Sequence, residues 1–361
     1  MYLSLRDLKY TKARYSLVCT VIALIALMTT VLAGLATGLV NDGISGLRNL
    51  PMTHLALQEG SENSFSRSTL TDKNLKPWKG VKSIETSKLG VSFFNAKTKD
   101  GQTIDVALFG VPQDSFLAPD KRAKESLSGK PGIVLSEKSR IDGLKVGDYL
   151  TIDGPDIKLP ILGFTYTGSY GHVPIAFTSL KTWQSLFYGE NSKGRFSAIA
   201  IKAEDTSEFN SLDSEARTQV RTKEASYAGS PGYSAETATM TLIRSFLLII
   251  SALIVGAFFT VWTIQRTRQI GLLKALGASN SYVLKDALGQ LILIVFLSTT
   301  IGVGIGVGLG SLVGDGAPFS LEPGSVILSN LLLAVLGIAG SLVAVRRIMK
   351  VDPIIALGSE N

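Results

Sequence analysis

Four long apolar runs without a charged residue dominate this sequence; they cover residues 15–40, 245–265, 287–313 and 325–345. A bilayer core is about 30 Å thick, and a helix that rises 1.5 Å per residue needs about 20 apolar residues to cross it. A soluble helix needs only one apolar side, whereas these runs are apolar all round. The sequence therefore predicts an α-helical membrane protein with four transmembrane helices. The second helix is predicted to span 239–265 and so to begin six residues before its uncharged run.

The first run, 15–40, has a basic flank and could be read as a cleaved signal peptide. It is much longer than the apolar region of a typical signal peptide, and no A-x-A cleavage site follows it. We therefore expect a retained anchor. The only cysteine, Cys19, lies inside this run, so the rest of the chain is expected to fold without disulfides.

The distribution of Lys and Arg predicts the orientation of the chain in a membrane. The N-terminal amphipathic segment 1–14, the loop 266–286 and the tail 346–361 together hold eleven basic and four acidic residues, which equals the net charge of +7. The loop 314–324 has acids only. Because basic loops stay inside, both termini and 266–286 are predicted to be cytoplasmic. The segment 41–238 and the loop 314–324 are then extracytoplasmic.

The inserted segment 41–238 reads as a mixed α/β extracytoplasmic domain between helices 1 and 2. Alternating or continuous apolar patterns bounded by turn residues predict strands; they occur at 132–136, 143–154, 157–168, 172–187 (a strand that leads into a helix) and 196–203. Residues 204–226 are predicted as one amphipathic helix that includes Val220. The polar stretch 58–74 is predicted as a mobile loop.

No enzyme motif is present in the sequence. It lacks G-x-x-x-x-G-K-[ST], H-E-x-x-H and G-x-S-x-G, and it has two histidines, too few for a His-rich metal site. The predicted helices carry no charge in their interior, which argues against a proton or ion pathway. The protein is thus predicted to be non-catalytic, without a metal or cofactor of its own. If it moves a substrate, the energy comes from a partner.

Small residues recur every four positions in two of the predicted helices. Gly34 and Gly38 lie in the first, and Gly302, Gly306 and Gly310 lie in the third. Such spacing lets helix backbones approach closely. It fits ordinary packing within the subunit, or a face that shifts during a transport cycle.

The loop 266–286 is predicted to contain a short amphipathic helix. Its apolar side is formed by Ile270, Leu272, Leu273 and Leu276, and Gly277 suits a helix C-cap. Such a helix could contact a soluble partner or lie on lipid headgroups, and the residues alone leave both readings open.

Three stretches carry a resemblance to a known family. "RTRQIGLLKALGAS" (266–279) resembles the cytoplasmic signature of MacB/FtsX-like ABC transporter permeases. "RRIMKVDPIIALGS" (346–359) is similar to their basic, proline-containing ending. "GIVLSEKSRIDGLKVGDYLTI" (132–152) resembles their extracytoplasmic domain. The order of one span, a large domain and three spans also matches, and the chain is most similar to permease subunits of bacterial haem exporters.

The resemblance implies that two copies of this permease form a homodimer in the bacterial plasma membrane, together with two copies of a separate ABC ATPase that binds ATP and Mg²⁺. The complex would export haem from the outer leaflet by mechanotransmission, in which movement of the ATPases passes through the helices to the outer domains. The ATPase-coupling residues would be Arg268, Ile270, Gly271, Leu272, Leu273, Lys274, Leu276 and Gly277. Two alternatives stay open: export of a lipid, lipoprotein or peptide, and FtsX-type regulation of a cell-wall enzyme.

Haem iron accepts His, Met, Tyr or Cys, and a cation can pair with a propionate. Candidate haem-binding residues near the outer membrane surface are Met52, His54, Tyr233, Glu236, Met240 and Arg244. His172 is a further candidate, expected farther from the membrane. Each also has a structural reading, as packing, exposed surface or interfacial snorkelling. Asn41 and Asp42 are expected to cap the first helix.

Overall fold

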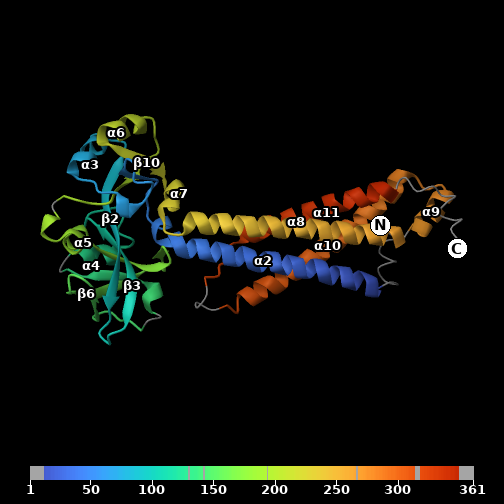
Figure 1. The fold of residues 1–361 in the computed structure, drawn as a ribbon, viewed down its shortest axis with the longest axis horizontal. Coiled ribbons are helices and arrows are strands. Elements are labelled where there is room, and N and C mark those ends of the chain that lie inside the picture. Colours follow the sequence, from blue (N-terminus) through green and yellow to red (C-terminus); the bar gives the residue numbers. More distant parts are fainter. Residues whose placement is uncertain are drawn as a thin grey trace. The chain divides into compact units, whose positions relative to one another are not determined.

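The computed structural model describes residues 12–128, 131–140, 143–192, 194–265, 267–313 and 318–348 (Figure 1). The predicted N-terminal segment 1–14 and tail 346–361 therefore lie mostly outside the described residues, as do 314–317 of the predicted outer loop. The chain divides into two compact units. One comprises Met1–Leu39 with Thr237–Asn361, and the other comprises Val40–Glu236.

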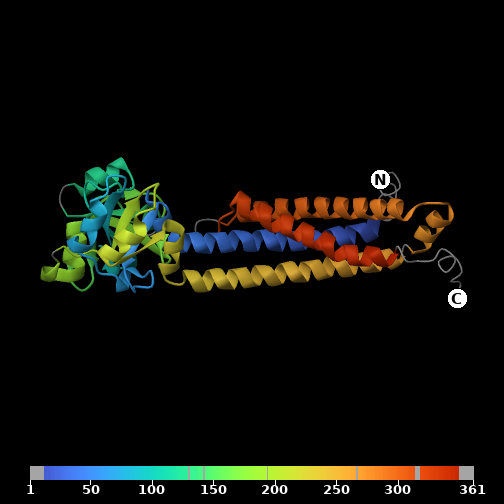
Figure 2. The same ribbon diagram turned by 90° about the horizontal axis from the view of Figure 1, so that it is seen from above.

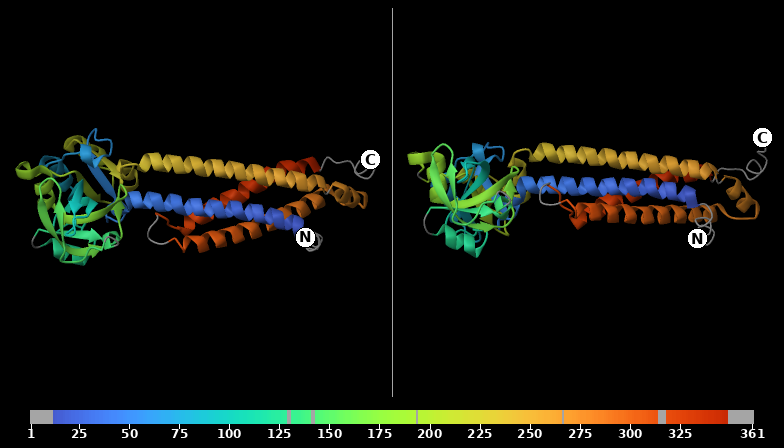
Figure 3. Two further views of the ribbon diagram at one scale, coloured as in Figure 1. Left: turned by 60° about the horizontal axis from the view of Figure 1, so that its bottom comes forward. Right: turned by 90° about the horizontal axis from the view of Figure 1, so that it is seen from below.

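Within the described part of the chain, four helices are long and apolar enough to cross a membrane, as predicted. They are α2 (Lys12–Arg48), α8 (Tyr233–Gln265), α10 (Asn280–Gly310) and α11 (Pro323–Ile348), and the short α9 (Thr267–Ala275) precedes α10. Figure 2 shows the apolar helices lying along one another, and Figure 3 shows the same arrangement from two further sides.

Helix α2 does not end near residue 40, and the expectation that Asn41 and Asp42 cap it is wrong. The helix continues to Arg48. The physical reason is burial: Ile44 and Leu47 are 3% and 0% exposed in an apolar cluster of the second unit. The amphipathic stretch after the apolar run therefore gains more as helix than as a loop.

The second unit is a mixed α/β domain, as predicted. Its strands are β1 (His54–Gln58), β2 (Glu85–Lys97), β3 (Thr103–Val111), β4 (Ile133–Ser136), β5 (Tyr149–Ile152), β6 (Ile157–Thr165), β7 (Ser169–Tyr170), β8 (Val173–Ser179), β9 (Ala198–Lys202) and β10 (Thr218–Thr222). Its helices are α3 (Asp72–Lys79), α4 (Lys121–Leu127), α5 (Leu180–Tyr188), α6 (Phe209–Ala216) and α7 (Lys223–Ser226), with short 3₁₀ turns between them, of which η2 spans Glu137–Arg140.

Strand β2 organises the sheet because it takes part in two sets of pairs. Its second half begins a closed ring in the order β2, β3, β8, β4, β6, β5 and back to β2. Its first half pairs with β9, and β1 and β10 follow outward from β9. One strand of 13 residues thereby joins the ring to the three-stranded extension of β9, β1 and β10.

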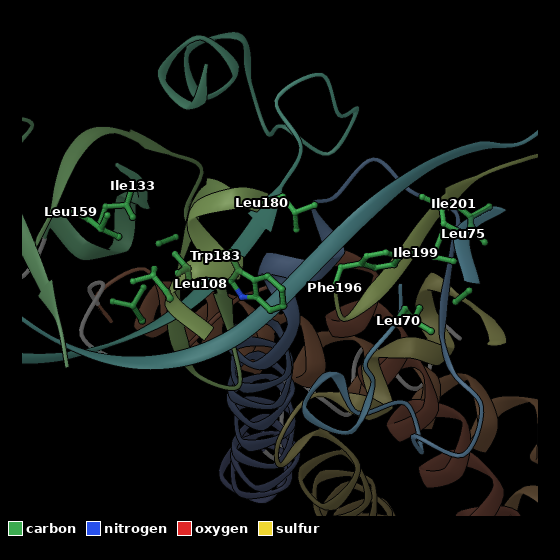
Figure 4. Close-up of a cluster of buried hydrophobic side chains, with 14 of the residues drawn as sticks. Leu70, Leu75, Leu108, Ile133, Leu159, Leu180, Trp183, Phe196, Ile199 and Ile201 are labelled. Atoms are coloured by element: carbon green, nitrogen blue, oxygen red, sulfur yellow. The ribbon is translucent and has the colours of Figure 1, made fainter. Parts of the chain in front are cut away.

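Trp183 of α5 is fully buried against the ring (Figure 4). An added Cβ on Gly90 would lie 2.3 Å from its indole, and one on Gly110 would lie 2.4 Å from its Cβ. The indole N–H donates a 3.0 Å hydrogen bond to Ser92 Oγ. Glycine at these two strand positions therefore makes the room that the tryptophan fills.

Two local predictions for this domain are wrong. Residues 58–74 are not a loose loop, because Phe65 and Leu70 are buried and Leu70 pairs with Phe196 through backbone hydrogen bonds. Residues 204–226 are not one helix, because α6 ends at Ala216 and the next residue, Arg217, is left-handed (φ +52°). The following strand β10 pairs Val220 with Ala56 of β1. Sheet pairing has overridden a helical pattern there.

Candidate functional site

The α/β domain receives α2 and starts α8 at one place, which we call the junction. It comprises the end of α2 (residues 40–48), the β7–β8 turn (Gly171 and His172) and the segment 230–236 that leads into α8. All three belong to the same compact unit. The junction thus contains both chain connections between the α/β domain and the apolar helices.

His172 lies between a carboxylate of α2 and one of α8. Its Nδ1 is 3.3 Å from Asp42 Oδ2, and its Nε2 is 2.8 Å from Glu236 Oε1. Lys138, from η2, pairs with the other oxygen of Asp42 and donates to Ser169 Oγ at 3.1 Å. Each of the three ionisable partners is only partly exposed, at 21–30% of its side chain.

The local sequence explains why a histidine stands at this turn. Tyr170 and Val173 pair across β7 and β8, which leaves a two-residue turn. Both turn residues have positive φ, +56° at Gly171 and +66° at His172. A tight hairpin favours this conformation, glycine adopts it freely, and histidine tolerates it better than bulky residues do. The turn therefore aims the imidazole at the two helices.

Hydrogen bonds to backbone carbonyls of α2 tie the helix to the β7–β8 turn, to Ser230 and to Tyr166. The Gly43 carbonyl of α2 accepts from the N–H of Gly171 at 2.8 Å and from Ser230 Oγ at 2.7 Å. The Gly46 carbonyl accepts from Tyr166 Oη at 2.9 Å. These donors bind carbonyls in the last two turns of α2, and Gly46 belongs to the last turn, where carbonyls lack partners within the helix.

Lys223 completes the C-terminus of α2. Its Nζ donates to the carbonyls of Arg48 at 2.9 Å and Leu50 at 3.1 Å. A cation at this position also complements the negative end of the helix dipole. The end of α2 is therefore anchored by both hydrogen bonding and charge.

Two tyrosines, the buried Tyr170 and the half-buried Tyr166, support the junction as neutral donors. Tyr170 Oη donates to the Gly229 carbonyl at 3.1 Å, and its ring stacks on Phe93 with centroids 5.7 Å apart. Burial raises the pKa of both Tyr166 and Tyr170 well above the usual value for tyrosine. Both phenols consequently keep their protons and their hydrogen bonds.

The structure unites some of the predicted haem-binding residues and separates others. His172 and Glu236 are in contact, at the start of α8. Tyr233 is half-buried and packs edge-on against Tyr227, at 6.2 Å. Met240 and Arg244 are half-buried farther along α8.

Met52 and His54 are in different surroundings. Met52 is 3% exposed inside an apolar cluster, so its thioether is not presented to a ligand. His54 packs edge-on against Phe209 at 4.9 Å, and its Nδ1 lies 2.9 Å from Thr53 Oγ1. Burial lowers the pKa of His54, and the nearby Glu224 offsets this in part. The surroundings of Met52 and His54 are those of side chains that pack within the domain.

The sequence analysis did not identify Lys138 as part of this site, and it assigned Asp42 to a helix cap instead. Lys138 is 96 residues from its partner Asp42 in the chain, so no local pattern connects them. The only signal was the glycine–histidine pair in "SYGHVP", which is typical of a two-residue hairpin turn.

The predicted coupling segment forms α9 and the turn that follows it. Ile270 is 7% exposed and packs with Val283, and Gly271 is buried too. Leu272 and Leu276 are 53% and 78% exposed. The segment therefore uses one apolar side to pack on the start of α10 and leaves two leucines uncovered.

Gly277 ends α9 as predicted. Its φ is +93°, its N–H donates to the Lys274 carbonyl, and the N–H of Ala278 donates to the Leu273 carbonyl. This is the Schellman arrangement, which needs a left-handed residue. The side chains of Leu273 and Lys274 are half-buried. Arg268 also lies in α9, but its side chain is outside the described part of the chain.

Comparison with known proteins shows which families and structures this chain is similar to. Residues 242–353 match the family FtsX-like permease C-terminal. The chain is 27% identical over 364 residues to a Staphylococcus haemolyticus protein named hemin transport system permease protein HrtB, covering 99% of both chains. It is 27% identical over 132 residues to the macrolide export ATP-binding/permease protein MacB of Bordetella avium, covering 34% of this chain and 20% of that protein. The solved periplasmic region of MacB from Actinobacillus actinomycetemcomitans superposes with a TM-score of 0.36 and 13% identity, over 50% of this chain and 94% of that one.

Proposed function

We propose that this chain is a MacB/FtsX-like ABC transporter permease and that it is the membrane subunit of an ABC exporter of haem. The similarity to the hemin transport permease over 99% of both chains is the observation that carries this proposal. The energy comes from a separate ATPase, because this chain has no phosphate-binding loop motif.

The exposed side of α9 is the proposed docking surface for that ATPase. Leu272 and Leu276 are both exposed, while Ile270 holds the helix against α10. An amphipathic helix with uncovered apolar residues is a common means of recognition between proteins. In this arrangement α9 faces the cytoplasm, both termini are cytoplasmic and the α/β domain is extracytoplasmic.

The proposed mechanism is mechanotransmission by a dimer of this chain with two ATPase copies. Closure of the ATPases on ATP and Mg²⁺ moves α9 and α10, and the movement passes through the apolar helices to the α/β domains. Helices α2 and α8 continue into the α/β domain as single helices, at residues 40–48 and 233–236. Such continuity supports transmission, because a helix carries displacement better than a flexible linker does.

Haem would be taken from the outer leaflet beside the first half of α8. Tyr233 and Met240 offer atoms that haem iron accepts, and Arg244 offers a cation for a propionate. All three are half-buried, so each retains an accessible part. His172 and Glu236, also candidates from the sequence, are engaged with each other.

A haemin titration of the purified protein in lipid nanodiscs tests this proposal. We expect a saturable shift of the Soret band that empty nanodiscs do not show. Arg244→Ala should weaken binding, while Arg140→Ala, which removes a surface arginine of the α/β domain, should not. Absorbance changes no larger than those of empty nanodiscs would instead favour export of a lipid, lipoprotein or peptide, or regulation of a cell-wall enzyme.

A further inference from the structure

We propose that His172 is a positioning residue that clasps α2 to α8, so that both connections of the α/β domain move together. The inference deepens the proposed function, on which its role in transport rests. The clasp consists of His172, Asp42, Glu236 and Lys138, which come from four separate elements of the chain. No other described element of the domain contributes an ion pair to this group.

Hydrogen-bonding chemistry defines the state of the clasp. Ionised carboxylates only accept hydrogen bonds, so both contacts of His172 form hydrogen bonds at once only when both ring nitrogens donate, as they do in the imidazolium form. The positive imidazolium and the Lys138 ammonium then balance the two carboxylates. The contacts are charge-assisted, and such hydrogen bonds are about twice as strong as neutral ones. A neutral substitute for His172 would leave two negative charges facing each other across one ammonium.

The surrounding backbone shows that the clasp joins elements that already converge. The Gly43 carbonyl binds both the β7–β8 turn and Ser230, just before α8. The side chain of His172 reaches one residue before Gly43, at Asp42, and the first turn of α8, at Glu236. Backbone and side-chain bonds therefore link the same three segments, which is what a rigid mechanical connection requires.

Occupied ring nitrogens also exclude a second role. An imidazole binds iron through a nitrogen lone pair, and neither ring nitrogen of the clasped imidazolium has one. In the clasped state, His172 therefore acts on transport through the positions of α2 and α8 and does not ligate haem.

Hydrogen–deuterium exchange of the whole protein in nanodiscs tests the clasp. His172→Asn is the main variant, because asparagine tolerates the left-handed turn but is too short to reach both carboxylates. Glu236→Gln is a second variant that keeps the turn intact and removes one charge. Asp148→Asn is the matched control: it removes a carboxylate from an ion pair with Lys99 (2.9 Å) at another place in the same domain.

We expect both junction variants to speed exchange about tenfold at residues 40–48 and 230–240 together, because local opening becomes easier when charged hydrogen bonds are lost. The control should leave both segments unchanged. The His172→Asn variant keeps Arg244, so its affinity for haemin in nanodiscs should stay within about twofold of the wild-type value.

Two results would overturn the clasp. One is unchanged exchange in both segments, and the other is faster exchange in only one of them. Loss of haemin binding with unchanged exchange would make His172 a ligand instead. If the wild-type protein binds no haemin, the haem proposal fails, whereas the exchange comparison still decides whether the clasp exists.

Discussion

Gly302 of α10 lies so close to Ala23 of α2 that an added Cβ would be 2.2 Å from the Ala23 carbonyl oxygen. Gly306 meets Thr30 of the same helix, at 2.9 Å from its Cβ. Gly304, by contrast, has no such neighbour within 4 Å. The glycine-rich sequence of α10 therefore has a packed side, which repeats every four residues, and an open side.

This contact predicts that alanine substitutions at Gly302 and at Gly304, two residues apart in α10, have different effects on stability. Gly302→Ala should lower stability by about 1–3 kcal/mol, because the methyl group collides with backbone and forces the helices apart. Gly304→Ala should be neutral or slightly stabilising, because alanine favours helix. Thermal unfolding of the two variants in the same detergent provides the comparison. Equal melting temperatures would mean that α2 and α10 are not packed as closely as described.

Under the proposed function, the exposure of α9 predicts which leucines bind the ATPase. Leu276→Asp and Leu272→Asp should leave membrane insertion intact and abolish co-purification of the ATPase, because a charge would be buried at the interface. Gly271 is buried and unsuitable for this test, since a bulky residue there would also disturb the packing of α9. Full recovery of the ATPase with Leu276→Asp would place the docking surface elsewhere.

The fit of Trp183 predicts a further matched pair. Gly90→Ala would place a methyl group within 2.3 Å of the indole and should destabilise the α/β domain by about 1–3 kcal/mol. Gly163→Ala introduces the same methyl group in β6, where nothing lies within 4 Å, and should be tolerated. Near-ultraviolet circular dichroism on heating follows the tryptophan environment directly. Coincident melting curves for both variants would contradict the assigned packing.

The lowered pKa of His54 predicts a pH effect on stability. Because the folded protein binds the His54 proton less readily than the unfolded chain does, acid favours unfolding. This loss of stability sets in as pH falls below the unfolded value of about 6.5. His54→Gln should therefore show a smaller drop in melting temperature between pH of about 8 and about 5 than the wild type. A steeper drop in the variant would reverse the sign assigned to this histidine.

The sequence was sufficient wherever a pattern is local. The four apolar helices could be predicted because each consists of one continuous run of apolar residues that is long enough to cross a membrane. Five of the ten described strands, namely β4, β5, β6, β8 and β9, followed from alternation and turn residues. Gly277 was identifiable as a helix end because a left-handed residue was required there.

Local patterns misled where tertiary contacts compete with them. Val220 fits a helical face, but pairing with Ala56 of β1 makes it a strand residue. Asp42 resembles a cap after an apolar run, but the burial of Ile44 and Leu47 extends the helix beyond it. In both cases long-range burial is worth more than the local preference.

The sequence by itself determined the membrane architecture, the α/β class of the inserted domain and the amphipathic segment that became α9, because periodicity and charge are properties of the chain alone. Only the tertiary structure decided which glycines of α10 contact α2 and which leucines of α9 stay exposed. It alone brought His172 to Asp42, 130 residues away, and to Glu236, 64 residues away. Contacts over such separations depend on how the sheet and helices pack, and no spacing along the chain encodes them.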